Sequence, residues 1–312
     1  MSAAPSIPIV DYVCPQVWAW RPWRARAMRG YLDHVLALLP FEPAFLARYR
    51  ACGYRFYLER VVGLHELDAS PETAQVDQPG TDELAPLLRG TVVHELLERL
   101  DFADAHAPTP EEVAARLESH GADSGEAPVA DVRRFVTAFL DSALYERLLQ
   151  ATRVRKELGF AYEVYPPQAG GRSLLVNGFV DVYAEEPGQV LIVDYKTDPL
   201  EGTDPEALVE SQYSIQRLIY ALAALRSHAP AVEVAYCFLE QPDAPVARRW
   251  TAEDAPALEE ELLGLAAGVI EGRFEPTAEP HLHLCARCAG RPGLCSWDEE
   301  ATSRMPDATL GA

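Results

Sequence analysis

The sequence predicts an α/β protein in which a mixed sheet is flanked by helices. Period-2 alternation of apolar and polar residues indicates strands, and apolar residues spaced three and four apart indicate helices. The pattern over 232–240 is typical of a strand buried in the sheet. The expected strands cover 155–166, 174–182, 190–196, 232–240 and 246–251. One expected helix starts near 89, and the others cover 110–119, 131–149, 205–226 and 254–271.

The stretch 174–197 is typical of two strands joined by a tight turn. Glu-Glu-Pro-Gly at 185–188 supplies that turn. Strict alternation along the first strand puts Phe179 and Asp181 on one face and Val180 on the other. The second strand is apolar until Asp194. Each strand therefore carries a carboxylate where the pattern calls for an apolar residue.

These two carboxylates point to a divalent cation. An unpaired carboxylate on so apolar a strand would be costly to desolvate, and Lys196 shares one side of its strand with Asp194. Two carboxylates beside a lysine suggest a cation that offsets their charge. Of 27 basic residues only Lys156 and Lys196 are lysines, and a compact ammonium is not replaced by a planar guanidinium near a metal-bound water. The alternative is a surface hairpin with scattered charges.

The run Gly178-Phe179-Val180-Asp181, followed by Asp194-Tyr195-Lys196, resembles the PD-(D/E)xK nuclease superfamily and its RecB/AddB-like branch. The resemblance covers about 45–297. It implies a restriction-endonuclease-like αβββαβ core, with a helical N-terminal region and a Cys-rich C-terminal tail. It also implies that Asp181, Asp194 and Lys196 form the catalytic centre.

Two further residues are assigned through this resemblance. His94 lies next to the apolar stripe of the helix that starts near 89. The matching helix of the family supplies a histidine metal ligand. Glu157 corresponds to a family strand whose Glu completes or neighbours the metal centre. The alternatives are a satisfied helical histidine and an exposed strand charge beside Lys156.

The helix after the hairpin completes the expected site. Gln216 and Tyr220 share one face of that helix, and the resemblance implies that they approach the scissile phosphate. The implied metal ligands are His94, Asp181, Asp194 and the carbonyl of Tyr195, with Mg²⁺ or Mn²⁺ as the ion.

The C-terminal part carries the spacing C-x2-C-x6-C. Three thiolates this close need a fourth ligand to complete a tetrahedral site. The resemblance to AddB-type nucleases implies a [4Fe–4S] cluster that Cys52 would complete, although those relatives often show x5 in place of x6 and Cys-Pro in place of Cys52-Gly53. Cys14 is a rival fourth ligand, and His281 or His283 with Zn²⁺ is another possibility. The three clustered cysteines are Cys285, Cys288 and Cys295.

Three segments are expected. Residues 1–44 form a Trp- and Arg-rich helical segment, 45–297 a nuclease domain closed by four cysteines, and 298–312 a flexible tail. A net charge of −21 argues against a generic nucleic-acid binder and suits an enzyme brought to DNA by a partner. No apolar run approaches the roughly 20 residues of a membrane span, and no secretory signal is evident, so a cytoplasmic protein with no membrane partner is expected.

The expected activity is metal-dependent hydrolysis of DNA phosphodiester bonds. Single-stranded DNA is the expected substrate, and the resemblance implies recombinational repair beside a helicase as the setting. A catalytically inactive nuclease-like scaffold, or a zinc-stabilised DNA-binding component of a helicase–nuclease complex, is the alternative.

Overall fold

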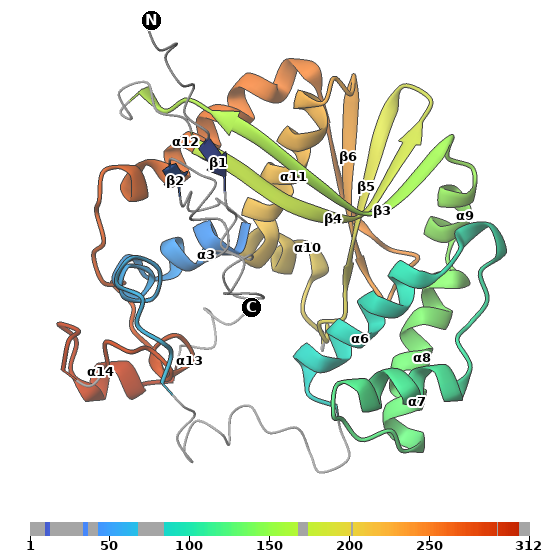
Figure 1. Ribbon diagram of the computed structural model, residues 1–312, viewed down its shortest axis with the longest axis horizontal. Coiled ribbons are helices and arrows are strands. Elements are labelled where there is room, and N and C mark those ends of the chain that lie inside the picture. Colours follow the sequence, from blue (N-terminus) through green and yellow to red (C-terminus); the bar gives the residue numbers. More distant parts are fainter. Residues whose placement is uncertain are drawn as a thin grey trace, which may run out of the picture.

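The computed structural model describes residues 10–12, 34–36, 43–67, 84–167, 174–200, 202–291 and 293–305. A five-stranded sheet forms its centre (Figure 1). The strand order is β3-β4-β5-β6-β7, with β5 and β6 parallel and every other neighbouring pair antiparallel. The strands are β3 (Arg153–Val164), β4 (Leu174–Glu186), β5 (Gln189–Lys196), β6 (Ala231–Phe238) and β7 (Val246–Thr251). The expected mixed α/β sheet is confirmed.

One face of the sheet packs against helices from both ends of the described chain. The core on this face contains side chains of all five strands, residues of three helices and a short helical turn, and Leu208 and Val209 from the run before the central helix. Leu218 and Ile219 of the central helix and Leu262 of the C-terminal helix are among its buried members. The elements are α3 (Pro43–Ala51), α4 (Gly53–Phe56), α11 (Ser214–Arg226) and α12 (Ala255–Ile270).

The other face packs against a group of consecutive helices, which lie together at the lower right of Figure 1. Val93 and Leu97 of the first helix are fully buried in this second core. The helices are α6 (Pro86–Arg99), α7 (Pro110–Ser119), α8 (Glu126–Leu140) and α9 (Ala143–Leu149). The prediction of a single helix over 131–149 is wrong, because α8 ends at Leu140 and Ser142 caps the separate helix α9. Its hydroxyl donates to the carbonyl of Phe139 (2.6 Å) and accepts from the amide of Tyr145 (3.2 Å).

The helix expected over 205–226 has three parts. Asp204 caps α10 (Pro205–Leu208), the π-helical turn η4 (Val209–Tyr213) follows, and α11 completes the run. A π-helical turn inserts one extra residue per turn and frequently occurs at functional sites. Here it lies directly before the helix that carries Gln216 and Tyr220.

The remaining described elements are short. They comprise β1 (Val10–Tyr12) and β2 (His34–Leu36), which pair in parallel, and η1 (Tyr57–Val62), η2 (Phe102–Asp104), η5 (Ala252–Asp254), α13 (Leu282–Cys285) and α14 (Glu299–Ser303). The expected helical segment 1–44 therefore shows two strands where it is described, apart from the start of α3, and its Trp/Arg cluster lies outside the described residues. The expected flexible tail is ordered where it is described: Asp298 caps α14 and Thr302 is buried. The carbonyl of Arg304 also accepts a hydrogen bond from the amide of Leu282.

Strand β4 changes faces at Asp181. Val176 and Val180 belong to the core beneath α11, whereas Val182 and Ala184 belong to the core beneath α6, although strict alternation would place all four on one face. The ladder with β3 omits the pair Glu157 and Asp181. Glu157 of β3 has φ = 46°, in the left-handed region. This conformation turns β3 at the position opposite Asp181.

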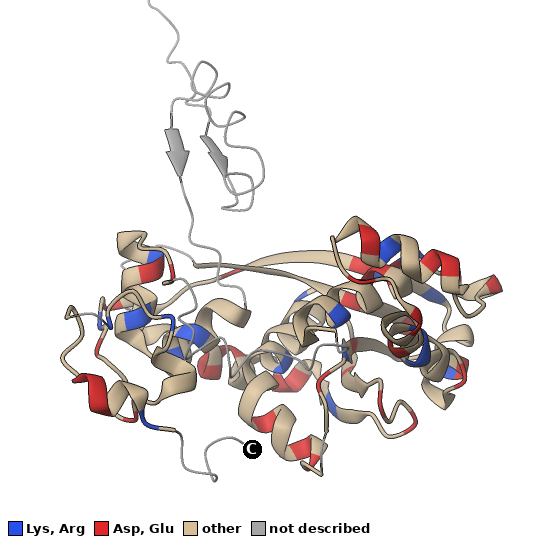
Figure 2. Ribbon diagram, turned by 90° about the horizontal axis from the view of Figure 1, so that it is seen from below, with Lys and Arg blue, Asp and Glu red and all other residues tan. Residues whose placement is uncertain are grey.

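Within the described residues, no helix is both long and apolar enough to cross a bilayer. Acidic and basic residues are interspersed along the helices (Figure 2).

Candidate active site

The candidate site lies where β4 and β5 separate. Their ladder ends at the pair Val182 and Val193, and the next residue on each strand is an aspartate. Asp181 accepts a hydrogen bond through Oδ2 from the amide of Tyr195 (2.8 Å), in place of the ladder hydrogen bond. The end of the hairpin therefore brings Asp181 and Asp194 to one point.

His94 reaches this point from α6. Its Nδ1 lies 3.5 Å from Oδ2 of Asp181, and its Nε2 lies 3.1 Å from the carbonyl oxygen of Tyr195. Burial by itself lowers the pKa of His94, but the hydrogen bond to Asp181 and the charges of Asp181 and Asp194 outweigh it and raise that pKa to about 9. A site that holds a proton this tightly favours positive charge.

Glu157 joins the same group from β3. One donor atom each of His94, Glu157 and Asp181 lie within 4.8 Å of one another, and this is the one such group of three among the described residues. Burial first, and then the charge of Asp181, raise the pKa of Glu157. Carboxylate oxygens with one imidazole suit Mn²⁺ or Mg²⁺, so the donor set fits the expected metal. Residues with unusual backbone angles such as Glu157 cluster at functional sites.

Asp194 belongs to a second, buried set of contacts. It is 2% exposed, and its Oδ1 lies 2.5 Å from Nζ of Lys196. Burial raises the pKa of Asp194; Lys196 counteracts this shift, and Asp181 adds to it. Asp194 on β5 thus lies opposite Asp181 on β4. Its carboxylate is paired with Lys196, outside the group formed by His94, Glu157 and Asp181.

Gln216 and Tyr220 extend this set from α11. Lys196 Nζ donates to Oε1 of Gln216 (3.2 Å), and Nε2 of Gln216 donates to the hydroxyl of Tyr220 (2.9 Å). The Tyr220 hydroxyl lies 2.8 Å from the carbonyl of Phe179 and 3.3 Å from Oδ2 of Asp194. The spacing of Gln216 and Tyr220 on one helical face, noted in the sequence, therefore places both on the lysine and the aspartate.

Two aromatic rings around Lys196 were not expected from the sequence. The ammonium of Lys196 lies 4.1 Å from the ring centroid of Tyr213 and 5.4 Å from that of Tyr236. Stacking of these two rings, with centroids 5.5 Å apart, fixes them around the lysine. Tyr213 lies at helical spacing from Gln216, which was the available signal; Tyr236, on β6, had none.

The four expected cysteines line one cavity. Cys52 and Cys288 are buried, and Cys285 and Cys295 are half-buried. The amide of Arg55 donates to Sγ of Cys52 and the amide of Gly290 to Sγ of Cys288, each at 3.4 Å. Burial raises the pKa of Cys285 and of Cys288. Residues 52 and 285–295 are thus brought together, while the rival Cys14 lies outside the described residues.

The side chain of Arg55 connects the two walls of this cavity. Its Nη1 donates to the carbonyl of Leu284 (2.5 Å), directly before Cys285. Its Nε and Nη2 bind Glu59 (2.6 Å) and Glu66 (3.0 Å). His281 caps the turn of Cys285, because its Nδ1 accepts from the amide of Leu284 (3.3 Å).

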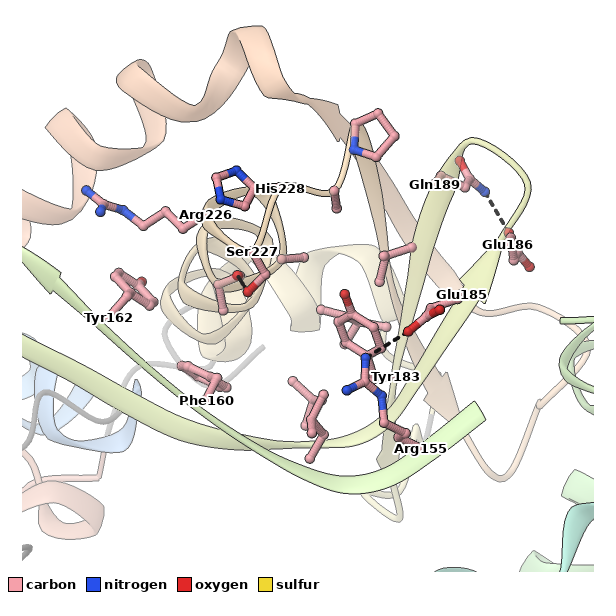
Figure 3. Close-up of a pocket in the computed structure, with 18 of the residues that line it drawn as sticks. Arg155, Phe160, Tyr162, Tyr183, Glu185, Glu186, Gln189, Arg226, Ser227 and His228 are labelled. Carbon is pink, nitrogen blue, oxygen red and sulfur yellow. Dashed lines mark hydrogen bonds and ion pairs between the residues drawn. The ribbon is translucent and has the colours of Figure 1, made fainter. Parts of the chain in front are cut away.

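A separate cavity of about 700 Å³ lies under the C-terminal end of α11 (Figure 3). Phe160, Tyr162 and Tyr183 line it, and Arg155 pairs with Glu185 at its rim (2.9 Å). It lies toward the hairpin turn, away from Asp194 and Lys196, and no group of three metal donors among the described residues borders it. We therefore place the chemistry at the strand ends.

Residues 43–293 match the family described as the PD-(D/E)XK nuclease superfamily. The match covers most of the chain, and the chain belongs to this superfamily, which confirms the resemblance to the superfamily. Its restriction-endonuclease-like fold agrees with the mixed sheet and the helices on both of its faces.

Two curated relatives are large components of ATP-dependent helicase/nucleases. The one from Acetivibrio thermocellus is 33% identical over 162 residues, which is 48% of this chain and 12% of that protein. Its counterpart from Bacillus thuringiensis is 30% identical over 154 residues, 45% of this chain and 12% of that protein. The chain thus spans about an eighth of the length of these relatives. The crystal structure of a candidate exonuclease from Eubacterium rectale aligns with a TM-score of 0.45 and 12% identity, covering 76% of this chain and 83% of that one.

The first part of the chain is similar to a different family. Residues 2–54 match lipid-A-disaccharide synthetase, and the lipid-A-disaccharide synthase of Rhodopseudomonas palustris is 73% identical over 52 residues, 16% of this chain and 13% of that enzyme. The Trp- and Arg-rich stretch falls inside this match. The Trp- and Arg-rich stretch therefore belongs to the part of the chain that is similar to this second family. The two family matches overlap only over residues 43–54.

Proposed function

We propose that this chain is a metal-dependent nuclease that hydrolyses phosphodiester bonds of single-stranded DNA. The observation that carries the proposal is that two adjoining sets of side chains lie at the end of one hairpin. His94, Glu157 and Asp181 form the first set, and Asp194 and Lys196 form the second. The membership of the nuclease superfamily supports the same reaction class.

His94, Glu157, Asp181 and the carbonyl of Tyr195 would hold Mg²⁺ or Mn²⁺. Asp194 would add its Oδ2, because its Oδ1 is paired with Lys196. A bound divalent ion of this kind lowers the pKa of a coordinated water and polarises a phosphoryl oxygen. The tight retention of a proton by His94 supports the assignment, because the negative field that raises its pKa also attracts a cation.

Lys196 would orient the attacking water and stabilise negative charge on the phosphate. Its ammonium is already fixed by Asp194, Gln216 and the ring of Tyr213, so little reorganisation is needed when substrate arrives. Gln216 and Tyr220 would position the strand, since their side chains form a hydrogen-bonded row beside Lys196.

The test is cleavage of end-labelled single-stranded DNA with and without Mg²⁺. Asp194→Ala should abolish Mg²⁺-dependent cleavage and leave the melting temperature close to that of the wild type. Asp104→Ala removes an exposed carboxylate far along the chain from the hairpin and should leave cleavage unchanged. Full activity in Asp194→Ala would remove the active-site assignment. Absence of any Mg²⁺-dependent cleavage by the wild type would favour the inactive scaffold.

We further propose that the chain works in the cytoplasm beside a helicase, in recombinational repair. The two helicase/nuclease relatives support this setting. Co-purification with a helicase from the source cell, followed by cleavage that depends on ATP, would test it. A nuclease that acts at full rate alone and binds no helicase would contradict it.

The cysteine cavity would hold a structural [4Fe–4S] cluster, with Zn²⁺ as the alternative. A tetrahedral zinc site with Zn–S bonds of about 2.3 Å needs sulfurs roughly 3.8 Å apart. The four cysteines that line this cavity supply the four sulfur ligands that either centre needs. Anaerobic purification with iron, sulfide and zinc analysis separates the two: one zinc per chain and no sulfide would contradict the cluster.

A further inference from the structure

Phe179 is an exposed aromatic ring beside the candidate active site. It is 54% exposed, whereas the next residue, Val180, is buried in the core. Phe179 lies two residues before Asp181 on β4, so their Cα atoms are about 7 Å apart at a rise of about 3.3 Å per residue. A DNA strand with a phosphate at Asp181 would therefore pass its neighbouring nucleotide close to this ring.

The backbone of Phe179 is held by α11, and its ring lies against a glycine of β3. The hydroxyl of Tyr220 donates to the carbonyl of Phe179 (2.8 Å), which ties this part of β4 to α11. The ring lies across Gly159, its partner in the ladder with β3. A Cβ at Gly159 would come within 3.1 Å of Cε1 of Phe179, so the glycine leaves the room that the ring occupies.

The same two strands contain a second ring over a glycine, and the comparison separates packing from binding. Phe160 covers Gly178 so closely that a Cβ there would lie 2.8 Å from its Cζ. Phe160 is half-buried and packs against the core. A ring over a strand glycine is a packing device, and for Phe160 this accounts for the ring. More than half of Phe179, in contrast, remains in solvent next to the site.

We propose that Phe179 is a base-stacking residue, on which the base next to the scissile phosphate stacks. This inference rests on the proposed nuclease function and specifies its substrate. Stacking on an aromatic ring does not depend on base identity. A base inside a duplex has both faces covered, so the ring would select single strands and frayed ends.

Steady-state cleavage of single-stranded DNA by variants of Phe179 tests the proposal. Phe179→Ala and Phe179→Leu should raise KM about tenfold with little change in kcat. Phe179→Trp should keep the wild-type KM. Leucine still covers Gly159 with apolar atoms but cannot stack, so it is the matched variant. Tyr165→Ala removes another exposed ring (60%), beyond the end of β3, and should leave KM unchanged.

Substrates with one abasic nucleotide, moved stepwise along the strand, identify the stacked base. At one position, the abasic nucleotide should raise the KM of the wild type about as much as Phe179→Leu raises the KM for intact DNA. The same abasic substrate should not raise the KM of Phe179→Leu any further. Unchanged KM in both Phe179→Leu and Phe179→Ala would overturn the proposal, as would a drop in melting temperature without any KM effect, because the ring would then serve packing alone.

A binding measurement keeps this inference separate from the nuclease proposal. Fluorescence anisotropy of a labelled oligonucleotide in the presence of Ca²⁺ needs no cleavage. If the wild type binds about tenfold more tightly than Phe179→Leu but never cleaves, the stacking site stands and catalysis fails. Equal binding by both proteins would overturn the stacking site even in an active nuclease.

Discussion

The candidate active site and the cysteine cavity both contain ionisable side chains from distant parts of the chain, but their charges are balanced differently. At the candidate active site, His94 and Lys196 already lie beside Asp181 and Asp194. In the cavity, burial raises the pKa of the Cys285 and Cys288 thiols, which keeps these two neutral until a metal displaces their protons. We therefore expect the first site to govern activity and the second to govern stability.

The largest expected effect is on stability, in Cys285→Ser. Loss of one ligand should release the metal and lower the free energy of unfolding by more than about 4 kcal/mol, because the link between residue 52 and the C-terminal turns is lost. Chemical denaturation and metal analysis measure this. Cys237→Ala is the control, since Cys237 is buried in the core outside the cavity; it should keep its metal. An unchanged melting temperature in Cys285→Ser would show that the cavity holds no shared centre.

Next is Lys196→Arg, which should lower kcat about a hundredfold and change the melting temperature little. The guanidinium keeps the charge but not the compact ammonium that fits between Asp194 and Tyr213. Lys156→Met is the reciprocal control. Lys156 donates to the carbonyls of Leu97, Glu98 and Leu100 at the end of α6, so its loss should cost about 2 kcal/mol of stability and spare kcat per folded molecule. Loss of kcat in both variants would contradict this separation.

A smaller effect is expected for Arg55→Met. The change removes the hydrogen bond to the carbonyl of Leu284 and leaves the buried carboxylate of Glu59 without this partner. We expect a loss of about 2 kcal/mol in stability, a faster release of metal to a chelator, and unchanged cleavage by the metal-loaded protein. Arg291→Met, which changes another arginine of the cavity wall, should release metal at the wild-type rate. Equal release by all three proteins would remove Arg55 as a support of the site.

The most restricted effect is a pH dependence of stability, which appears only once EDTA has removed the metal. The pKa of His94 is about 9 in the folded protein, above its ordinary value of 6.5. Because His94 binds its proton more tightly in the folded protein than in the unfolded chain, protonation of His94 stabilises the fold. This stabilisation is complete below pH 6.5 and is lost as the pH rises through 9. His94→Gln should remove that decline from the unfolding free energy measured between pH 6.5 and 9, relative to the wild type. Parallel curves for both proteins would mean that His94 carries no such proton.

Local patterns predicted most of the sheet and the hairpin part of the site. Alternation and the turn at 185–188 define the register of β4 and β5, and that register alone brings Asp181 opposite Asp194. His94 and Glu157 required the family resemblance, because they reach the site from α6 and β3 through tertiary packing that no local pattern encodes.

Other features were beyond sequence reasoning for physical reasons. The face change of β4 lies opposite a left-handed backbone at Glu157 on β3, and glutamate is a residue type that gives no signal for this conformation. The break in the helix at Ser142 was hidden because the apolar stripe continues on both sides of it. Tyr236 meets Lys196 only because β6 lies beside β5 in parallel.

The exchange of faces at Glu157 and Asp181 has a consequence for how this protein can change over evolutionary time. A slip of β4 by a single residue would separate the two acids and, at the same stroke, carry valines from each core into the wrong layer. Variants with misaligned acids would thus unfold before they could persist as inactive enzymes. Purifying selection for a folded chain would then preserve the alignment of the acids, even in a lineage that no longer needed their chemistry.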